Sequence, residues 1–394
     1  MVHYDPYMPE IMDDPHRVYA QLRAESPIHY IERFDAWALA RFEDIWEASA
    51  DDVHFSVGNA TAERGFLEGE PTTMEVLSSI DPPRHTGLRK RLFPHFGPRA
   101  ARALEPRVRE WVRECIERHA PTGRMDAVND LAQPIAFRVA CAVSGFPVED
   151  ADDLIRMVRD SFHREEGTEG QTEVGQLARD EMRDYLIGLA ARHQAGAVNV
   201  HALDVLASES EANVPFTAEQ IGQHLTLLLV GATETFPKAF ASGLLRLWQH
   251  PDQRRELCAD PSLIPKALQE MFRFDMPTQW LGRTTIRDCE IRGQSIRTGQ
   301  PVLFLYPSGN RDEQEFEKPD VFDIHRDPPR ILTFGTGTHR CLGAFMAEME
   351  GRVLLEELLR VCPDYEVLES EVFWPATEFV QGYRDFPIAF DPPS

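Results

Sequence analysis

Cys341 lies near the end of a segment whose residue types are suited to holding a metal. Residues 334–343 read FGTGTHRCLG, and a strand-like run at 330–333 leads into them. An amphipathic helix is expected to begin near Cys341. A cysteine at a helix N-terminus lies at the positive end of the helix dipole, which lowers its pKa, and a glycine-rich backbone can direct N–H groups at the sulfur. Such hydrogen bonds tune an iron-bound thiolate, so a thiolate ligand is one interpretation of this segment.

Two other interpretations compete with it. A dinucleotide-binding fingerprint needs a third glycine at position 340 and an acidic residue about 20 positions further on, and the chain has Arg340 there. A buried structural cysteine is the usual role of a single cysteine. That role, however, does not require Gly335 and Gly337 upstream of the pair His339-Arg340.

The segment resembles the haem-binding loop of the cytochromes P-450. The matching positions are Phe334, Gly335, Gly337, His339, Cys341 and Gly343. The resemblance implies a mainly α protein with a minor β portion, folded as a triangular helical prism. It also implies that haem b lies between a long central helix and the cysteine-bearing helix, with Cys341 as the axial ligand of the iron.

A long helix is predicted to begin at Thr217, which forms a capping box with Gln220. The helix can extend to about Gln249, and Pro237 should open or kink it. Taken alone, the segment 231–237, GATETFP, is compatible with a simple helix kink that has polar residues at its edge. It is also similar to the oxygen-activation motif of the family, although Ala232 stands where the family commonly has glycine. The resemblance implies that Thr235 hydrogen-bonds iron-bound dioxygen and that Glu234 relays protons.

Glu270 and Arg273 lie three residues apart and can pair on one helix face. Such pairs are common on exposed helices. Their place in the chain resembles the Glu-x-x-Arg helix of the family, where a buried pair holds the core around the cysteine loop. The family's third partner is often an arginine before a phenylalanine, and here Val321 precedes Phe322.

Haem carries two propionates, which need cationic or N–H donors once they are partly buried. Each candidate alone is more typical of a surface cation. The resemblance implies that the donors are His85, Arg89, Arg283 and His339.

The net charge and hydropathy of the chain limit the kinds of partner that we expect. The net charge of −24 argues against nucleic acid or an anionic membrane as a partner. No apolar run approaches the roughly 20 residues that span a bilayer, and the start of the chain lacks a secretory pattern. We expect a cytoplasmic monomer with one domain over 1–394, whose β portion lies near 28–40, 282–306 and the C-terminus.

The resemblance implies a monooxygenase that inserts one atom of O2 into an organic substrate. Electrons must come from outside, because the chain has no flavin or iron–sulfur segment. A basic cluster is expected to bind an acidic ferredoxin. Its residues are Arg89, Lys90, Arg91 and Arg340. The alternatives are a peroxide-driven peroxygenase, against which Glu234-Thr235 argues, and a non-enzymatic haem sensor.

Alignment to the family indicates a largely apolar substrate pocket, which favours a hydrophobic small molecule. Its expected lining is Leu227, Val230, Gly231, Gln279, Leu281 and Phe379. Gln279 is the one polar candidate, and it is equally typical of a strand end. The loop 60–79 is expected to close over the pocket with Phe66, Leu67, Met74 and Leu77.

Overall fold

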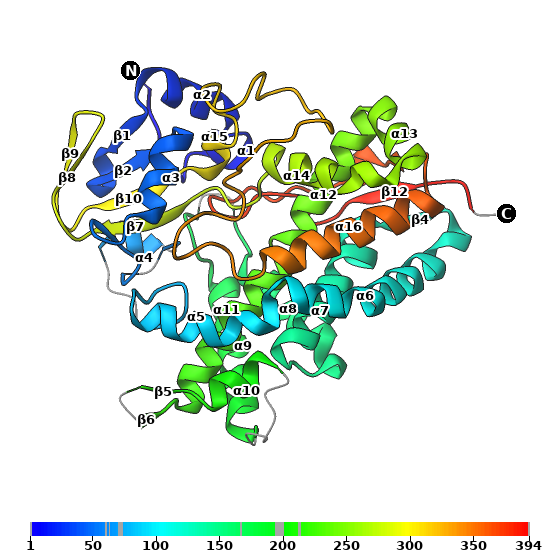
Figure 1. Cartoon of the computed structure of the whole chain (residues 1–394), viewed down its shortest axis with the longest axis horizontal. Helices are drawn as coiled ribbons and strands as arrows, with labels where there is room; N and C mark the ends of the chain where they lie inside the picture. Colours follow the sequence, from blue (N-terminus) through cyan, green and yellow to red (C-terminus); the bar gives the residue numbers. More distant parts are fainter. Residues whose placement is uncertain are drawn as a thin grey trace.

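Helices make up most of the fold, and the larger β-sheet lies at one corner of it (Figure 1). The computed structural model describes residues 2–59, 61–62, 64–69, 74–165, 168–193, 201–211 and 214–392. The helices are α1 (Pro9–Asp13), α2 (His16–Glu25), α3 (Phe42–Ala50), α4 (Arg64–Leu67), α5 (Arg84–Phe96), α6 (Pro98–His119), α7 (Gln133–Ser144), α8 (Ala151–Ser161), α9 (Glu173–Arg192), α10 (Ala202–Ala207), α11 (Ala218–Thr233), α12 (Phe236–Gln249), α13 (Pro251–Ala259), α14 (Ile264–Phe274), α15 (Tyr306–Gly309) and α16 (Ala344–Val361). None of the helices within these ranges is long and apolar enough to cross a membrane.

The strands form one larger and three smaller sheets. They are β1 (Ile28–Ile31), β2 (Ala36–Leu39), β3 (Phe55–Ser56), β4 (Arg124–Asp126), β5 (Ser210–Glu211), β6 (Val214–Pro215), β7 (Leu281–Thr285), β8 (Cys289–Ile291), β9 (Gln294–Ile296), β10 (Pro301–Phe304), β11 (Glu366–Val367) and β12 (Pro387–Ala389). The larger sheet has the order β1-β2-β10-β7-β3, with β10 parallel to β2. The mainly helical class with a minor β portion is confirmed, and the short strands β3 to β6 were not predicted.

The central helix breaks where the sequence predicts. Thr217 caps α11 and completes a capping box with Gln220. α11 ends at Thr233 and α12 begins at Phe236, because Pro237 has no N–H to donate to the preceding turn. α11 packs against α9 and α7 and passes through the middle of the molecule (Figure 1). Glu234 and Thr235 therefore occupy the break, at the centre of the fold.

The cysteine-bearing helix begins later than predicted. α16 starts at Ala344 with Gly343 as its N-cap, so Cys341 lies in the turn before the helix. The expected strand at 330–333 is absent from the described chain. Its backbone is satisfied elsewhere, since Leu332 N donates to Asn310 Oδ1 at 2.8 Å. α16 packs against α6 and α14, and α5 crosses beside it.

Candidate functional site

A backbone hydrogen bond at Cys341 shapes the cysteine loop. Cys341 N donates to the carbonyl of Phe334 at 2.8 Å, which closes the loop. Gly337 has φ 69° and packs against the backbone of Ser49, where a Cβ would lie 2.5 Å from the Ser49 oxygen. No larger residue fits there, so the glycine lets the loop turn against α3.

Cys341 is exposed, and glycines lie beside it and on the facing helix α11. A Cβ at Gly343 beside it, or at Gly231 on α11, would meet no atom within 4 Å. Burial raises the pKa of the Cys341 thiol, while the amides of Gly343 and Ala344 and the guanidinium of Arg89 oppose that rise. These donors would stabilise a thiolate once a metal binds the sulfur.

Two histidines from distant parts of the chain meet beside the loop. The rings of His85 on α5 and His339 lie 4.1 Å apart between centroids. Both ring nitrogens of His85 and Nε2 of His339 are buried, with no hydrogen-bond partner in the described chain. Burial and Arg89 lower the pKa of His85 to about 4. Burial, Arg283, His85 and Arg89 lower that of His339 to about 3.

Two arginines complete this group. Arg283 on β7 is 6% exposed, and its guanidinium lies over the ring of Phe304. Arg89 on α5 donates to the carbonyl of Arg340. A buried cation at Arg283, a partly buried one at Arg89 and unpaired ring nitrogens favour an anionic group between them. The residues present therefore fit a porphyrin with two carboxylates, and the structure brings His85, Arg89, Arg283 and His339 close together.

Phe334 and Gly343 add no polar side chain to the cysteine loop. Phe334 packs edge-on against Phe272 of α14, with centroids 5.5 Å apart. Gly343 presents only backbone next to the cysteine. Phe334 contacts Cys341 through its carbonyl, which accepts from Cys341 N, and Gly343 follows Cys341 by two residues.

The acid and the alcohol of the helix break have different environments. Thr235 is half-buried, and its Oγ1 donates to the carbonyl of Gly231 at 3.4 Å. Glu234 is 7% exposed and forms an ion pair with Lys238, one turn further along α12. Burial raises the pKa of Glu234, and Lys238 and Arg164 oppose that rise. The sequence interpretation missed Lys238, although the i,i+4 spacing from Glu234 was the available signal.

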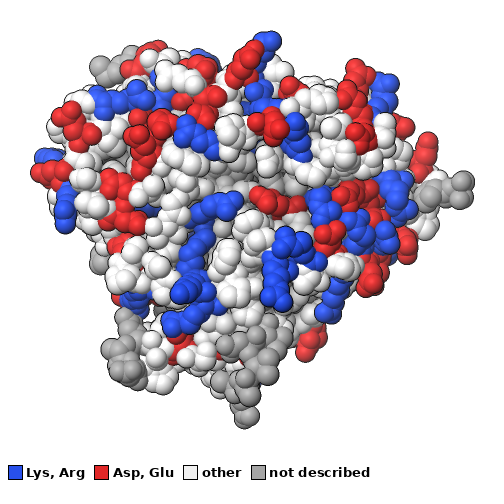
Figure 2. Space-filling view, viewed as in Figure 1, with Lys and Arg blue, Asp and Glu red and all other residues white. Residues whose placement is uncertain are grey.

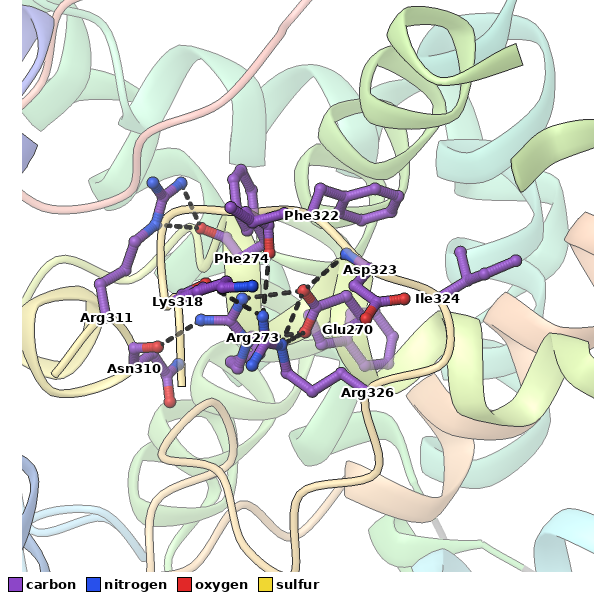
Figure 3. Close-up of polar contacts among 12 residues, drawn as sticks. Glu270, Arg273, Phe274, Asn310, Arg311, Lys318, Phe322, Asp323, Ile324 and Arg326 are labelled. Atoms are coloured by element: carbon purple, nitrogen blue, oxygen red, sulfur yellow. Dashed lines mark hydrogen bonds and ion pairs between the residues drawn. The ribbon is translucent and has the colours of Figure 1, made fainter. Parts of the chain in front are cut away.

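Glu270 and Arg273 form the buried core of a polar network (Figure 3). Both side chains are fully buried, and two hydrogen bonds of 2.7 and 2.8 Å join them. Arg273 also donates to the carbonyl of Asn310 at 2.7 Å. Arg326 supplies the third member of the network, since its Nε lies 3.2 Å from Glu270. The pair connects α14 to the start of the cysteine loop through Asn310, whose side chain accepts from Leu332 N.

Most of the expected pocket residues retain accessible surface. Leu227, Val230, Leu281 and Phe379 are half-buried, and Gly231 is exposed. Gln279 differs, since its side chain accepts from Tyr19 Oη at 3.3 Å and donates to the carbonyl of Pro277 at 3.2 Å. Its amide is thus hydrogen-bonded within the chain, and its role as a substrate contact stays a prediction.

The expected pocket cover lies partly outside the described residues, namely at 60, 63 and 70–73. Phe66 is buried and stacks on Trp280, and Leu67 belongs to the same buried cluster. Leu77 is buried in the main core and Met74 is half-buried. Phe66 and Leu67 are thus packed against Trp280, and the covering role of the loop stays a prediction.

Comparisons with known proteins agree with this geometry. A family model described as Cytochrome P450 matches residues 176–368. The chain is 34% identical to Cytochrome P450 130 of Mycobacterium tuberculosis, over 96% of both proteins. It is 31% identical to the Vitamin D(3) 25-hydroxylase of Pseudonocardia autotrophica, over 99% of this chain and 97% of that protein. The structure of cytochrome P450 CREJ in complex with (4-ethylphenyl) dihydrogen phosphate superposes with a TM-score of 0.87 at 27% identity and covers 99% of both chains.

The chain belongs to the cytochrome P450 family. It is a haem-thiolate monooxygenase that binds haem b and uses O2 on a hydrophobic small molecule.

Proposed function

We propose that Cys341 is the axial ligand of the haem iron and that His85, Arg89, Arg283 and His339 hold the two haem carboxylates. The observation that carries the proposal is the ring contact between His85 and His339, where both ring nitrogens of His85 and Nε2 of His339 are buried without a hydrogen-bond partner in the described chain. Bound haem would supply the oxygen chemistry. Phe334 and Gly343 would pack beside it.

The chain's own part is to position the substrate and to deliver protons. Thr235 Oγ1 would hold a proton at the helix break, with Glu234 as its neighbouring acid. Leu227, Val230, Gly231, Leu281 and Phe379 would line the substrate pocket with apolar surface. Hydroxylation is the expected reaction, in line with the relative named Vitamin D(3) 25-hydroxylase.

An acidic ferredoxin is the proposed electron donor. Figure 2 shows Lys and Arg side chains on pale surface over α5, on the face where the cysteine-bearing helix α16 also lies. Lys90 and Arg91 of α5 are exposed, although Arg91 pairs with Glu209. Arg89 is partly buried and binds Arg340, so Lys90 and Arg91 would supply most of the attraction.

We also propose that residues 1–394 form one domain that acts as a monomer in the cytoplasm. One cluster of buried side chains extends from Leu77 to Phe390, which supports one domain. All six cysteines are free thiols, as is typical of a reducing compartment. Light scattering during size-exclusion chromatography tests the monomer.

The absorption spectrum of the dithionite-reduced protein with carbon monoxide tests the haem ligand. A strongly red-shifted Soret band that Cys341→Ala abolishes is expected for thiolate ligation. A carbonyl spectrum of the histidine type would overturn the assignment of Cys341. Product formed with peroxide alone would favour a peroxygenase, and failure to turn over any substrate with a reductase system would favour a haem sensor.

A further inference from the structure

A histidine shares one face of the central helix with residues proposed to line the substrate pocket. His224 lies in α11, seven residues before Gly231, and seven residues are close to two full turns. The two positions therefore lie on the same face, about 10 Å apart along the helix axis. Between them this face carries Leu227 and Leu228, which are both half-buried. One polar side chain thus stands at the end of an apolar strip that leads to the exposed Gly231.

The imidazole ring of His224 is held in place, but only one of its nitrogens has a partner. The residue is 2% exposed. Its Nδ1 lies 2.9 Å from the carbonyl oxygen of Gln220, and the ring of Phe216 packs against it with centroids 5.6 Å apart. These two contacts fix the orientation of the ring. Nε2 is buried and has no hydrogen-bond partner in the described part of the chain.

A role in packing alone does not account for this nitrogen. A buried polar atom without a partner has lost its hydration and gained nothing in return. A phenylalanine would fill a similar volume beside Phe216 without that loss. The Nε2 atom is therefore better explained if a bound molecule supplies the missing hydrogen bond. Since Nε2 is shielded from bulk water, solvent would compete little for it once such a molecule is bound.

The protonation of the ring decides which kind of group can bind. Burial lowers the pKa of His224, the Gln220 carbonyl opposes that shift, and Arg84 adds to it. The imidazole is therefore neutral at neutral pH and carries a single N–H. A carbonyl oxygen can only accept a hydrogen bond, so the proton is on Nδ1, beside Gln220, and Nε2 carries a lone pair. A ligand group at Nε2 must donate.

We propose that His224 is a specificity-determining residue whose Nε2 accepts a hydrogen bond from a hydroxyl group of the substrate. The inference rests on the proposed substrate pocket and narrows its ligand to a hydrophobic alcohol. Its hydroxyl would lie about 10 Å from the carbon that is oxidised beside Gly231. Leu227 and Leu228 would contact the apolar part between the two ends. An ether or ketone at the same place would present only lone pairs to Nε2 and would bind less tightly.

Equilibrium dialysis of the haem-loaded protein tests this without turnover. The probes are decanol and decyl methyl ether, which share an apolar chain, but only the alcohol can donate a hydrogen bond. The wild type should bind decanol about tenfold more tightly than the ether. His224→Phe should lower the affinity for decanol by about tenfold and leave that for the ether unchanged.

His250→Phe is the matched control. His250, at the C-terminal end of α12, also has Nδ1 close to a backbone carbonyl, at 2.8 Å from that of Arg246. Its ring likewise packs against an aromatic side chain, Phe322, with centroids 5.4 Å apart. Because this histidine lies outside the proposed pocket, His250→Phe should keep the wild-type preference for the alcohol.

The outcomes separate this proposal from the proposed function. Wild-type protein that binds the ether as tightly as the alcohol would overturn the role of His224, even if His224→Phe does not fold. An unchanged preference in His224→Phe, or an equal loss in His250→Phe, would overturn it as well. The carbon monoxide spectrum of the same samples reports on Cys341 independently of the probes. Its loss in the wild type would instead count against the proposed function.

Discussion

Arg326 reaches Glu270 at 3.2 Å, although 56 residues separate the two in the chain. The Glu-x-x-Arg pair thereby gains a third charged member that the sequence pattern did not identify (Figure 3). Arg326 also donates to the carbonyls of Glu317, Lys318 and Val321. One guanidinium therefore ties the segment before the cysteine loop to the buried acid of α14.

Replacing Arg326 by Met should destabilise the protein. The change leaves buried oxygens of Glu270 and several carbonyls with fewer donors, which should lower the free energy of unfolding by about 1–3 kcal/mol. Urea unfolding followed by circular dichroism measures the difference. Arg255→Met is the control, because the exposed pair Arg255–Asp252 should contribute under about 1 kcal/mol. Equal effects of the two substitutions would contradict the role of Arg326.

Asn310 should affect how firmly haem is held. Its side chain accepts from Leu332 N at 2.8 Å and donates to Thr333 Oγ1 at 3.0 Å, so it fixes the start of the cysteine loop. Asn310→Ala leaves the Leu332 N–H unsatisfied and should loosen the loop by about 1–3 kcal/mol. Haem transfer to an acceptor apoprotein should then become faster by about tenfold or more. Asn129→Ala, which removes an exposed asparagine, should leave the transfer rate unchanged.

Glu350 on α16 should make stability fall with rising pH. Burial raises the pKa of this carboxyl to about 8, and its Oε2 has no partner among the described residues. The folded state therefore retains a proton that the unfolded chain has released, so stability decreases between the unfolded pKa of about 4.5 and the folded pKa of about 8. Urea unfolding at several pH values should show this slope in the wild type.

The Glu350→Gln variant should flatten that slope and should be more stable than the wild type at alkaline pH. The exposed Glu110 on α6 provides a matched control, and Glu110→Gln should keep the wild-type slope. A wild-type slope in Glu350→Gln would show that another group governs the pH dependence.

Charge reversal at Lys90 and Arg91 should slow reduction by an acidic ferredoxin. Opposite charges speed association at low ionic strength, so Lys90→Glu with Arg91→Glu should lower the second-order rate by about tenfold or more at low salt, and by less at high salt. Stopped-flow reduction measures the rate. Arg297→Glu, in the turn between β9 and β10, should leave it unchanged. Equal rates for all three proteins would exclude this surface as the docking site.

The sequence specified the local features of this protein. The order of residues in 334–343 identifies the cysteine loop, because the glycines and Cys341 act through their own backbone and its neighbours. Thr217 and Gln220 predict the start of the central helix, and Pro237 predicts its break, since capping and the missing N–H act within one turn. The approximate places of the main strands also follow from short apolar runs.

Tertiary structure decided which side chains become partners across the chain. Arg326, rather than a residue next to Phe322, binds Glu270. Tyr19 donates a hydrogen bond to the side-chain amide oxygen of Gln279, a partner that the sequence did not indicate. Even Lys238, whose spacing from Glu234 is local, is buried only because Val380, Phe162 and the small Gly382 enclose it. Hydrogen bonds and burial depend on which surfaces meet in the folded protein. The distances between residues far apart in the chain cannot be derived from the order of residues alone.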